Sequence, residues 1–143
     1  MTNLKSSSKI SLDTNILISA LKRNHPKNEA ARELIEQIKK IKPFVFISVL
    51  VIEEYLIHVY KQKQEKQIPN ILNFITLEGL CSVIDVNRQI AMSAAKLRVM
   101  YLSLRTPDAI HLASAIESGA ETFITTDRKI PRKIGKLTVK VLS

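Results

Sequence analysis

Four acidic side chains lie where an apolar run ends or a helix begins, at places where a carboxylate can either cap a helix or bind a metal ion. They are Asp13, Glu54, Asp108 and Asp127. Taken singly, each has a simpler explanation as a cap, a turn residue, a partner of the helix dipole or a surface charge. Taken together, several partly buried carboxylates would repel one another and take up protons unless a divalent cation offset their charge. Oxygen ligands of this kind suit Mg²⁺ or Mn²⁺, so the sequence predicts a site for one of these ions.

Short strands and amphipathic helices that alternate along the chain must position these carboxylates. Apolar and β-branched runs predict strands over residues 9–13, 44–47, 81–86, 122–125 and 137–142. Helical periodicity predicts helices over residues 14–22, 28–40, 48–60, 71–77, 88–100 and 106–118. Ser48, Asn87 and Thr106 are the expected N-caps, and Gly119 is expected to end the last helix. The polar segment 61–70 is expected to be a helix end followed by an exposed connection.

This alternation predicts an α/β fold in three layers, with a mostly parallel central sheet between two layers of helices. A single domain is expected over residues 9–143, preceded by a disordered or extended segment over residues 1–8. In sheets of this kind, binding sites lie beyond the carboxyl ends of the strands. All four acidic residues are expected near that edge of the sheet.

The charge balance indicates an anionic partner. The chain has 22 Lys and Arg residues against 13 Asp and Glu residues, a net charge of +9, which favours binding to polyanions such as nucleic acid. Residues 128–140 contain no acid, and the cations expected to contact phosphates there are Arg128, Lys129, Arg132 and Lys133. A solvated basic tail is the alternative explanation of this run. Aromatic residues make up only 5% of the chain, so base stacking is not expected to dominate recognition.

Other sequence features indicate the cellular compartment and exclude some classes of enzyme. The single cysteine, Cys81, cannot form an internal disulfide, and no apolar run approaches the roughly 20 residues that a bilayer requires. We therefore expect a cytoplasmic protein with no membrane association. The sequence has no glycine-rich phosphate loop, which argues against a kinase or an ATPase. His111, one helical turn after Asp108, is expected to be a core or supporting residue more often than a group that lines the cleft.

Four motifs in order resemble the PIN-domain nucleases, and in particular the VapC-like toxin ribonucleases. They are LDTN at 12–15, ISVLVIEEYL at 47–56, TPDAIHLASAIESGA at 106–120 and FITTDRKIP at 123–131. The resemblance implies a parallel sheet with helices on both sides and a metal-dependent ribonuclease site. It places Asp13, Glu54, Asp108 and Asp127 at the acidic positions of the family. It also implies that the residues that support the site through hydrogen bonds are Thr14, Asn15 and Thr126.

The resemblance further implies hydrolysis of RNA phosphodiester bonds, a homodimer, and a small antitoxin protein that blocks the cleft. Asp13 would bind Mg²⁺ or Mn²⁺ directly, Asp108 and Asp127 directly or through water, and Glu54 would bind the metal or orient a water molecule. Lys129 stands where some family members carry a further acid, which leaves fewer ligands for a second ion. Two other interpretations stay open: a housekeeping RNA-processing nuclease, and a non-catalytic nucleic-acid-binding module that keeps the fold.

Overall fold

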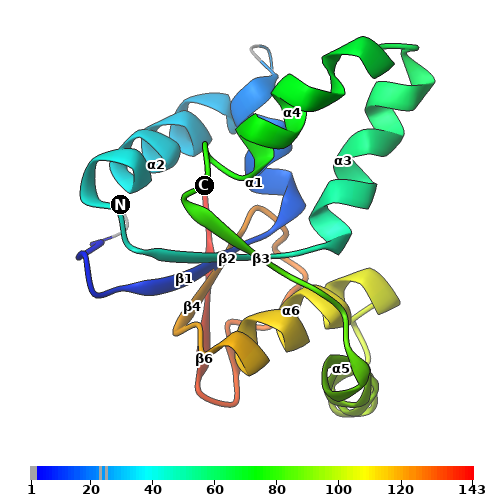
Figure 1. The fold of residues 1–143 in the computed structure, drawn as a ribbon. Helices are drawn as coiled ribbons and strands as arrows, with labels where there is room; N and C mark the ends of the chain where they lie inside the picture. Colours follow the sequence, from blue (N-terminus) through cyan, green and yellow to red (C-terminus); the bar gives the residue numbers. More distant parts are fainter. Residues whose placement is uncertain (1–2, 23, 25) are drawn as a thin grey trace.

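Strand β1 (Lys9–Leu12) lies in the middle of a six-stranded sheet, in a computed structural model that describes residues 3–22, 24 and 26–143 (Figure 1). The strand order is β3-β2-β1-β4-β6-β5. All neighbouring strands are parallel except β5 and β6, which are antiparallel. The other strands are β2 (Phe44–Ser48), β3 (Cys81–Ile84), β4 (Thr122–Thr125), β5 (Lys133–Ile134) and β6 (Leu137–Val141).

Helices cover both faces of this sheet, so the predicted three-layer α/β fold is confirmed. One layer contains α1 (Thr14–Leu21), α2 (Asn28–Ile41), α3 (Leu50–Lys61) and α4 (Ile68–Ile75). The other layer contains α5 (Arg88–Met100) and α6 (Thr106–Ser118), which lie together below the sheet in Figure 1. Each layer packs on its own apolar core, the first around Ile16, Leu17 and Val51 and the second around Leu112 and Phe123.

Local sequence signals set several element boundaries as predicted. The Asn87 side chain accepts a hydrogen bond from the backbone N–H of Ile90 at 2.9 Å, and α5 begins at the next residue, Arg88. Helix α6 ends at Gly119, whose φ of +86° is a left-handed conformation that glycine adopts without strain. Two predicted caps are each wrong by one residue, however, and both lie close to the carboxylates in the sequence.

Helix α3 begins at Leu50, whereas Ser48 was the predicted N-cap. Ser48 is still part of β2, and the chain continues one residue further because the Val49 N–H donates to the Ile84 carbonyl of the neighbouring strand at 2.8 Å. The Ser48 hydroxyl nevertheless accepts from the Leu50 N–H at 3.2 Å. At α6, the N-cap is Arg105 and the predicted cap Thr106 is the first helical residue.

The segment 61–70 contains more helix than predicted. A 3₁₀ turn covers Glu65–Gln67, and α4 then begins at Ile68, three residues earlier than expected. Pro69 lies in the first turn of α4, where a missing N–H breaks no helical hydrogen bond. The two-residue strand β5 was also not predicted, since it is too short to show an alternating pattern.

The described part of the N-terminal segment departs from a simple extended chain. The Ser8 N–H donates to the Lys5 carbonyl at 2.9 Å, which closes a turn, and the Leu4 side chain is packed into the first core. The first two residues lie outside the described residues. The boundary at residue 9 itself stays a prediction.

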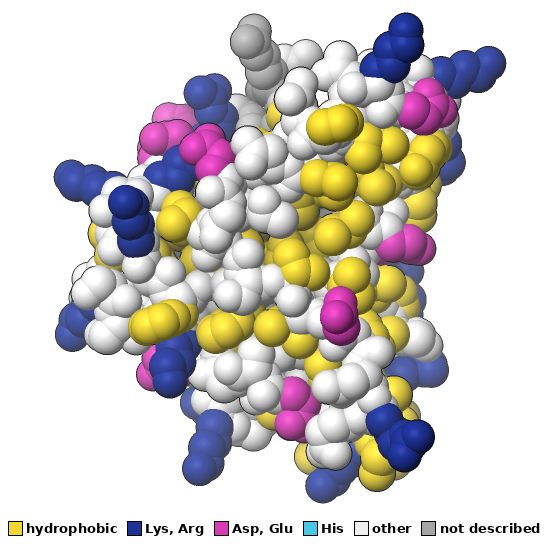
Figure 2. All heavy atoms as spheres, viewed as in Figure 1, with side chains coloured by type: hydrophobic (Ala, Val, Ile, Leu, Met, Phe, Trp, Pro, Cys, Tyr) yellow, Lys and Arg dark blue, Asp and Glu magenta, His cyan; other side chains and the backbone are white. Residues whose placement is uncertain are grey.

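Apolar side chains gather on the surface over α3 and α4, and Figure 2 shows this face. Ile57 and Tyr60 of α3 are 41% and 55% exposed. A contiguous apolar surface on a folded domain commonly marks a protein–protein contact. Among the helices that the structure describes, none has both the length and the apolar character to cross a membrane.

Candidate active site

The four acidic residues singled out in the sequence line one pocket of about 260 Å³. Asp13 follows β1 directly, and Asp127 comes two residues after β4. Because β1 and β4 are parallel neighbours, with Leu12 opposite Ile124, these two residues lie at the same edge of the sheet. Glu54 comes from α3 and Asp108 from the first turn of α6. The remaining residues that line the pocket are Thr14, Asn15, Arg105, Pro107 and His111.

Asp13 is the most enclosed of these carboxylates, with 7% of its surface exposed. Its Oδ1 accepts from the Thr14 N–H at 2.8 Å, and its Oδ2 accepts from the Thr125 hydroxyl at 2.7 Å. Burial raises the pKa of Asp13 above the ordinary value for an aspartate, although the charge of His111 and the Thr125 hydrogen bond act in the opposite direction. The negative charge on Asp13 is therefore costly without a positive partner, as expected for a metal ligand.

Thr125 supports the site at the position where the sequence pointed to Thr126. The Thr125 side chain is fully buried, donates to Asp13 and accepts from the Asp127 N–H at 3.0 Å, so it connects two of the four acids. Thr126 does not line the pocket. Strand β4 ends at Thr125 and Thr126 lies in the bend that follows, so the two adjacent threonines have different surroundings. Of the other predicted supporting residues, Thr14 makes side-chain contacts within the site and Asn15 lines the pocket from an exposed position.

Glu54 receives two hydrogen bonds on the same oxygen. Its Oε1 accepts from the Thr14 hydroxyl at 2.8 Å and is bonded to His111 Nε2 at 2.5 Å. Burial alone would raise the pKa of Glu54, but the hydrogen bond and charge of His111 bring this pKa below its ordinary value. For His111, burial alone would lower the pKa, because it disfavours the charged imidazolium. The hydrogen bond with Glu54 and the charges of Asp13, Glu54 and Asp108 raise the pKa of His111 overall. The sequence favoured a core or supporting residue at His111, and the structure shows a buried side chain paired with a site carboxylate.

The carboxylates of Asp108 and Asp127 are each held by the protein through one oxygen. Asp108 Oδ2 accepts from the Arg105 N–H at 3.0 Å, and the Arg105 guanidinium lies 3.7 Å from the same oxygen. Asp127 Oδ1 accepts from the Lys129 N–H at 2.9 Å. These backbone contacts hold the side chains at the pocket and leave Asp108 Oδ1 and Asp127 Oδ2 without a hydrogen bond to any described residue.

The donor set suits a hard divalent cation. Within residues 3–22, 24 and 26–143, no set of three or more His, Cys, Asp or Glu side chains is placed so that it could hold a metal ion. Mg²⁺ does not require such a set, because it commonly keeps several water ligands and binds only one or two carboxylates directly. The buried charge of Asp13 fits this mode of binding, and so do Glu54, Asp108 and Asp127, each of which has one carboxylate oxygen with no hydrogen bond to a described residue.

The four predicted phosphate-contacting cations do not lie together. Arg128 and Lys129 directly follow Asp127 at the pocket edge. Arg132 is folded back on its own loop, where its guanidinium donates to the Ile130 carbonyl at 2.9 Å. Lys133 pairs with Thr138, which lies opposite Thr122 at the start of β4, so Lys133 is at the other end of that strand. The sequence did not single out Arg105, which lines the pocket and has a side chain that is 82% exposed.

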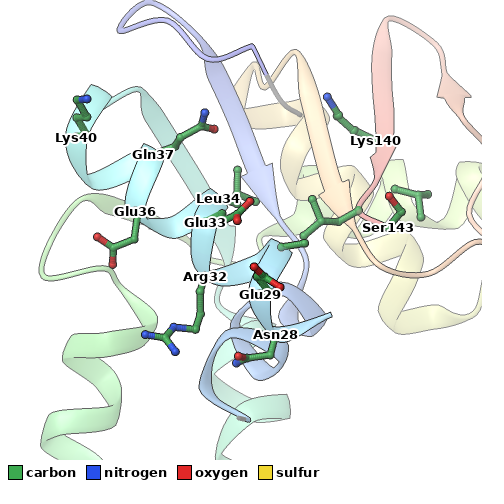
Figure 3. Close-up of a pocket in the computed structure, with 13 residues that line it drawn as sticks. Asn28, Glu29, Arg32, Glu33, Leu34, Glu36, Gln37, Lys40, Lys140 and Ser143 are labelled. Carbon is green, nitrogen blue, oxygen red and sulfur yellow. The ribbon is translucent and has the colours of Figure 1, made fainter. Parts of the chain in front are cut away.

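A larger groove of about 1310 Å³ lies elsewhere, between α2 and the C-terminal end of β6 (Figure 3). The side chains along its α2 wall mix both signs of charge, with Glu29, Glu33 and Glu36 beside Arg32 and Lys40. Such mixing is usual on the solvated face of a helix. None of the four site carboxylates lines this groove, so the smaller pocket is the candidate active site.

Solved structures with the same fold include three toxin or toxin–antitoxin structures. VapBC2 from Rickettsia felis, bound to a DNA fragment from its promoter, has a TM-score of 0.71 and 23% identity over 94% of this chain and 98% of that chain. A toxin–antitoxin complex from Klebsiella pneumoniae has a TM-score of 0.66 and 26% identity over 90% and 95% of the two chains. VapC20 from Mycobacterium tuberculosis, described as a toxin that cleaves the sarcin–ricin loop, has a TM-score of 0.62 and 17% identity over 80% and 86%.

The solved structures show a shared fold, whereas comparison of the sequence with family models identifies the family. No curated protein sequence gave a significant match. The model of the PIN domain, by contrast, matches residues 10–136, which cover most of β1, helices α1 to α6 and each of the four pocket acids. The chain therefore belongs to the PIN-domain family.

Proposed function

We propose that this protein is a metal-dependent endoribonuclease that hydrolyses RNA phosphodiester bonds. The observation that carries the proposal is the convergence of four carboxylates from four separate elements on one pocket, with Asp13 buried. Membership of the PIN-domain family supports nuclease chemistry, and the donor set supports Mg²⁺ or Mn²⁺ as the cofactor. Each residue of the site then has a specific role.

Asp13 would be the direct metal ligand, because its charge is buried and no cationic side chain among the described residues is hydrogen-bonded to it. Asp108 and Asp127 would bind the ion directly or through water with the oxygens that accept no hydrogen bond from a described residue. Glu54, fixed by Thr14 and His111, binds the ion or orients the water that attacks the phosphorus. When bound, a divalent cation lowers the pKa of a water ligand and offsets negative charge on the phosphate.

Positive side chains near the pocket support an RNA substrate. Arg105 lines the pocket itself and is exposed enough to reach a bound phosphate. Arg128 and Lys129 extend the positive charge along the same edge. A guanidinium pairs well with phosphate oxygens, so we assign Arg105 to the phosphate nearest the carboxylates. The sarcin–ricin loop activity of VapC20 from M. tuberculosis supports structured RNA as the substrate class.

We further propose that the protein is the toxin of a toxin–antitoxin pair and acts in the cytoplasm. Its structural relatives from R. felis and K. pneumoniae are described as toxin–antitoxin assemblies. The apolar surface over α3 and α4 offers a place for a protein partner, either a small antitoxin or a second copy of the chain in a homodimer. Co-purification with the product of a neighbouring gene would test the first of these partners.

Cleavage of end-labelled RNA tests the enzymatic proposal directly. Purified protein is incubated with structured and single-stranded RNA in Mn²⁺, Mg²⁺ or EDTA. Asp13→Asn removes the buried ligand, and Asp85→Asn is the matched control because Asp85 is exposed and lies outside the pocket. We expect metal-dependent cuts with the wild type and the control, and none with Asp13→Asn. Absence of cuts in the wild type, together with no Mn²⁺ binding by calorimetry, would instead indicate a non-catalytic binding module.

A further inference from the structure

His111 and Thr14 bind the same oxygen atom of Glu54 from two different helices. The Thr14 hydroxyl, at the start of α1, donates to Glu54 Oε1 at 2.8 Å, and His111 Nε2, from α6, lies 2.5 Å from that oxygen. Glu54 Oε2 makes no hydrogen bond with the described residues. The two contacts therefore distinguish the oxygens of this carboxylate, one held by protein and one left for the pocket.

His111 is buried, and its contact with Glu54 explains why a polar side chain occurs at this position. The residue is 4% exposed and sits three positions after Asp108, on the same face of α6. Its other ring nitrogen, Nδ1, is buried and has no hydrogen-bond partner among the described residues. An imidazole in such a place costs free energy unless a polar contact offsets its burial. The contact with Glu54 is the one that the described residues supply.

We infer that His111 is a positioning residue, which acts with Thr14 to hold Glu54 so that its Oε2 faces the metal ion. The inference rests on the proposed function, because it assumes that the pocket binds Mn²⁺ or Mg²⁺. A direct role for His111 in the reaction does not fit its surroundings, since its Nε2 is occupied by Glu54 and its Nδ1 is enclosed. Groups that orient metal ligands are worth about 10–100-fold in metal affinity.

A matched pair of substitutions at His111 tests this role. The amide nitrogen of glutamine reaches about as far from the backbone as His Nε2, whereas that of asparagine reaches only about as far as His Nδ1. His111→Gln therefore keeps a donor near Glu54 and His111→Asn does not, while both lose the packing of the ring. His58→Gln, at an exposed position of α3 outside the pocket, is the control for a change of residue type.

The first readout is Mn²⁺ affinity, measured by calorimetry on metal-free protein. We expect His111→Asn to bind Mn²⁺ about 10–100-fold more weakly than the wild type, and His111→Gln and His58→Gln to stay close to it. The thermal midpoints of the two His111 variants in EDTA should be similar, because both lose the packing of the ring. A difference in their Mn²⁺ affinity then cannot arise from a difference in folding. Saturating Mn²⁺ should restore RNA cleavage by His111→Asn, because a residue that only positions a ligand is not needed once the ion is bound.

Each contrary result has a defined meaning. Equal Mn²⁺ affinity of His111→Asn, His111→Gln and the wild type would overturn the positioning role and leave the ribonuclease proposal intact. No Mn²⁺ binding by the wild type would overturn the metal-dependent function and this inference with it. If neither His111 variant folds, Thr14→Ser and Thr14→Val form the second pair, since only serine keeps the hydroxyl that holds Glu54 Oε1. Equal Mn²⁺ affinity of these two variants would refute the inference.

Discussion

Replacing Thr125 by valine removes one hydroxyl and changes the shape of the side chain very little. That hydroxyl makes two hydrogen bonds in a fully buried position, one to the Asp13 carboxylate and one from the Asp127 N–H. Valine is at least as favourable as threonine in a strand, so β4 itself should be preserved. The variant therefore isolates what the two hydrogen bonds contribute.

The expected loss follows from the kind of bond that is removed. A hydrogen bond to a charged group contributes about 1.5–3 kcal/mol and a bond between neutral groups about 0.5–1.5 kcal/mol. The sum for Thr125→Val is a decrease of roughly 2–4.5 kcal/mol in the free energy of unfolding. For a chain of this size, roughly 3 °C accompanies each kcal/mol, so the thermal midpoint should fall by roughly 6–14 °C.

The loss should also depend on pH in a defined direction. The Thr125 hydrogen bond lowers the pKa of Asp13, which means that it stabilises the ionised carboxylate. Its contribution is therefore fully present when Asp13 is ionised and declines as the pH falls through the pKa of Asp13 in the folded protein. Burial raises that pKa, so the decline should begin at a higher pH than for an ordinary aspartate.

Thermal and urea unfolding in EDTA, followed by circular dichroism, would measure the effect without bound metal. Thr126→Val is the matched control, because Thr126 is the neighbouring threonine and does not line the pocket. We expect this control to unfold within about 0.5 kcal/mol of the wild type. Equal losses in the two variants, or no loss in Thr125→Val, would refute the assignment of the supporting hydroxyl to Thr125.

Three further predictions address the site and the fold. Mn²⁺ at 100 times its Kd should stabilise the wild type by about 2.7 kcal/mol in thermal unfolding and leave Asp13→Asn unchanged; equal stabilisation of both would place the ion elsewhere. Arg105→Ala should weaken binding of single-stranded RNA and reduce the slope of log K against log salt by about 0.7, whereas Lys133→Ala, at the far end of the sheet, should change binding less. Asn87→Ala should cost about 1 kcal/mol in urea unfolding through loss of the α5 cap, with no change in RNA cleavage.

Features that depend on nearby residues were predictable from the sequence. The cap at Asn87 and the glycine stop at Gly119 need only local backbone geometry, and the structure has both. The approach of Asp13 to Asp127 followed from a general property of parallel sheets, since adjacent strands end at a common edge. The alternation of strands and helices predicted the three layers, because the helices that connect parallel strands pack on both faces of the sheet.

Features that depend on how one element meets another were not predictable in the same way. The choice between Thr125 and Thr126 depends on where β4 ends, and a run of polar residues after an apolar pair does not reveal that end. The role of His111 requires α3 to lie against both α1 and α6. The position of Lys133 requires the hairpin of β5 and β6 to turn back along β4. Pairings of this kind between distant segments leave no local pattern in the sequence.

The place of β4 between β1 and β6 has a consequence for synthesis of the protein. While the chain grows on a ribosome, β1, β2 and β3 emerge first, and the outer edge of β1 has no partner until β4 follows. The last acid of the pocket and the hydroxyl that supports Asp13 arrive together on that late segment. A nascent chain therefore cannot bring the four carboxylates together until Asp127 has been translated, and chains released before β4 carry an unpaired strand edge and an incomplete pocket.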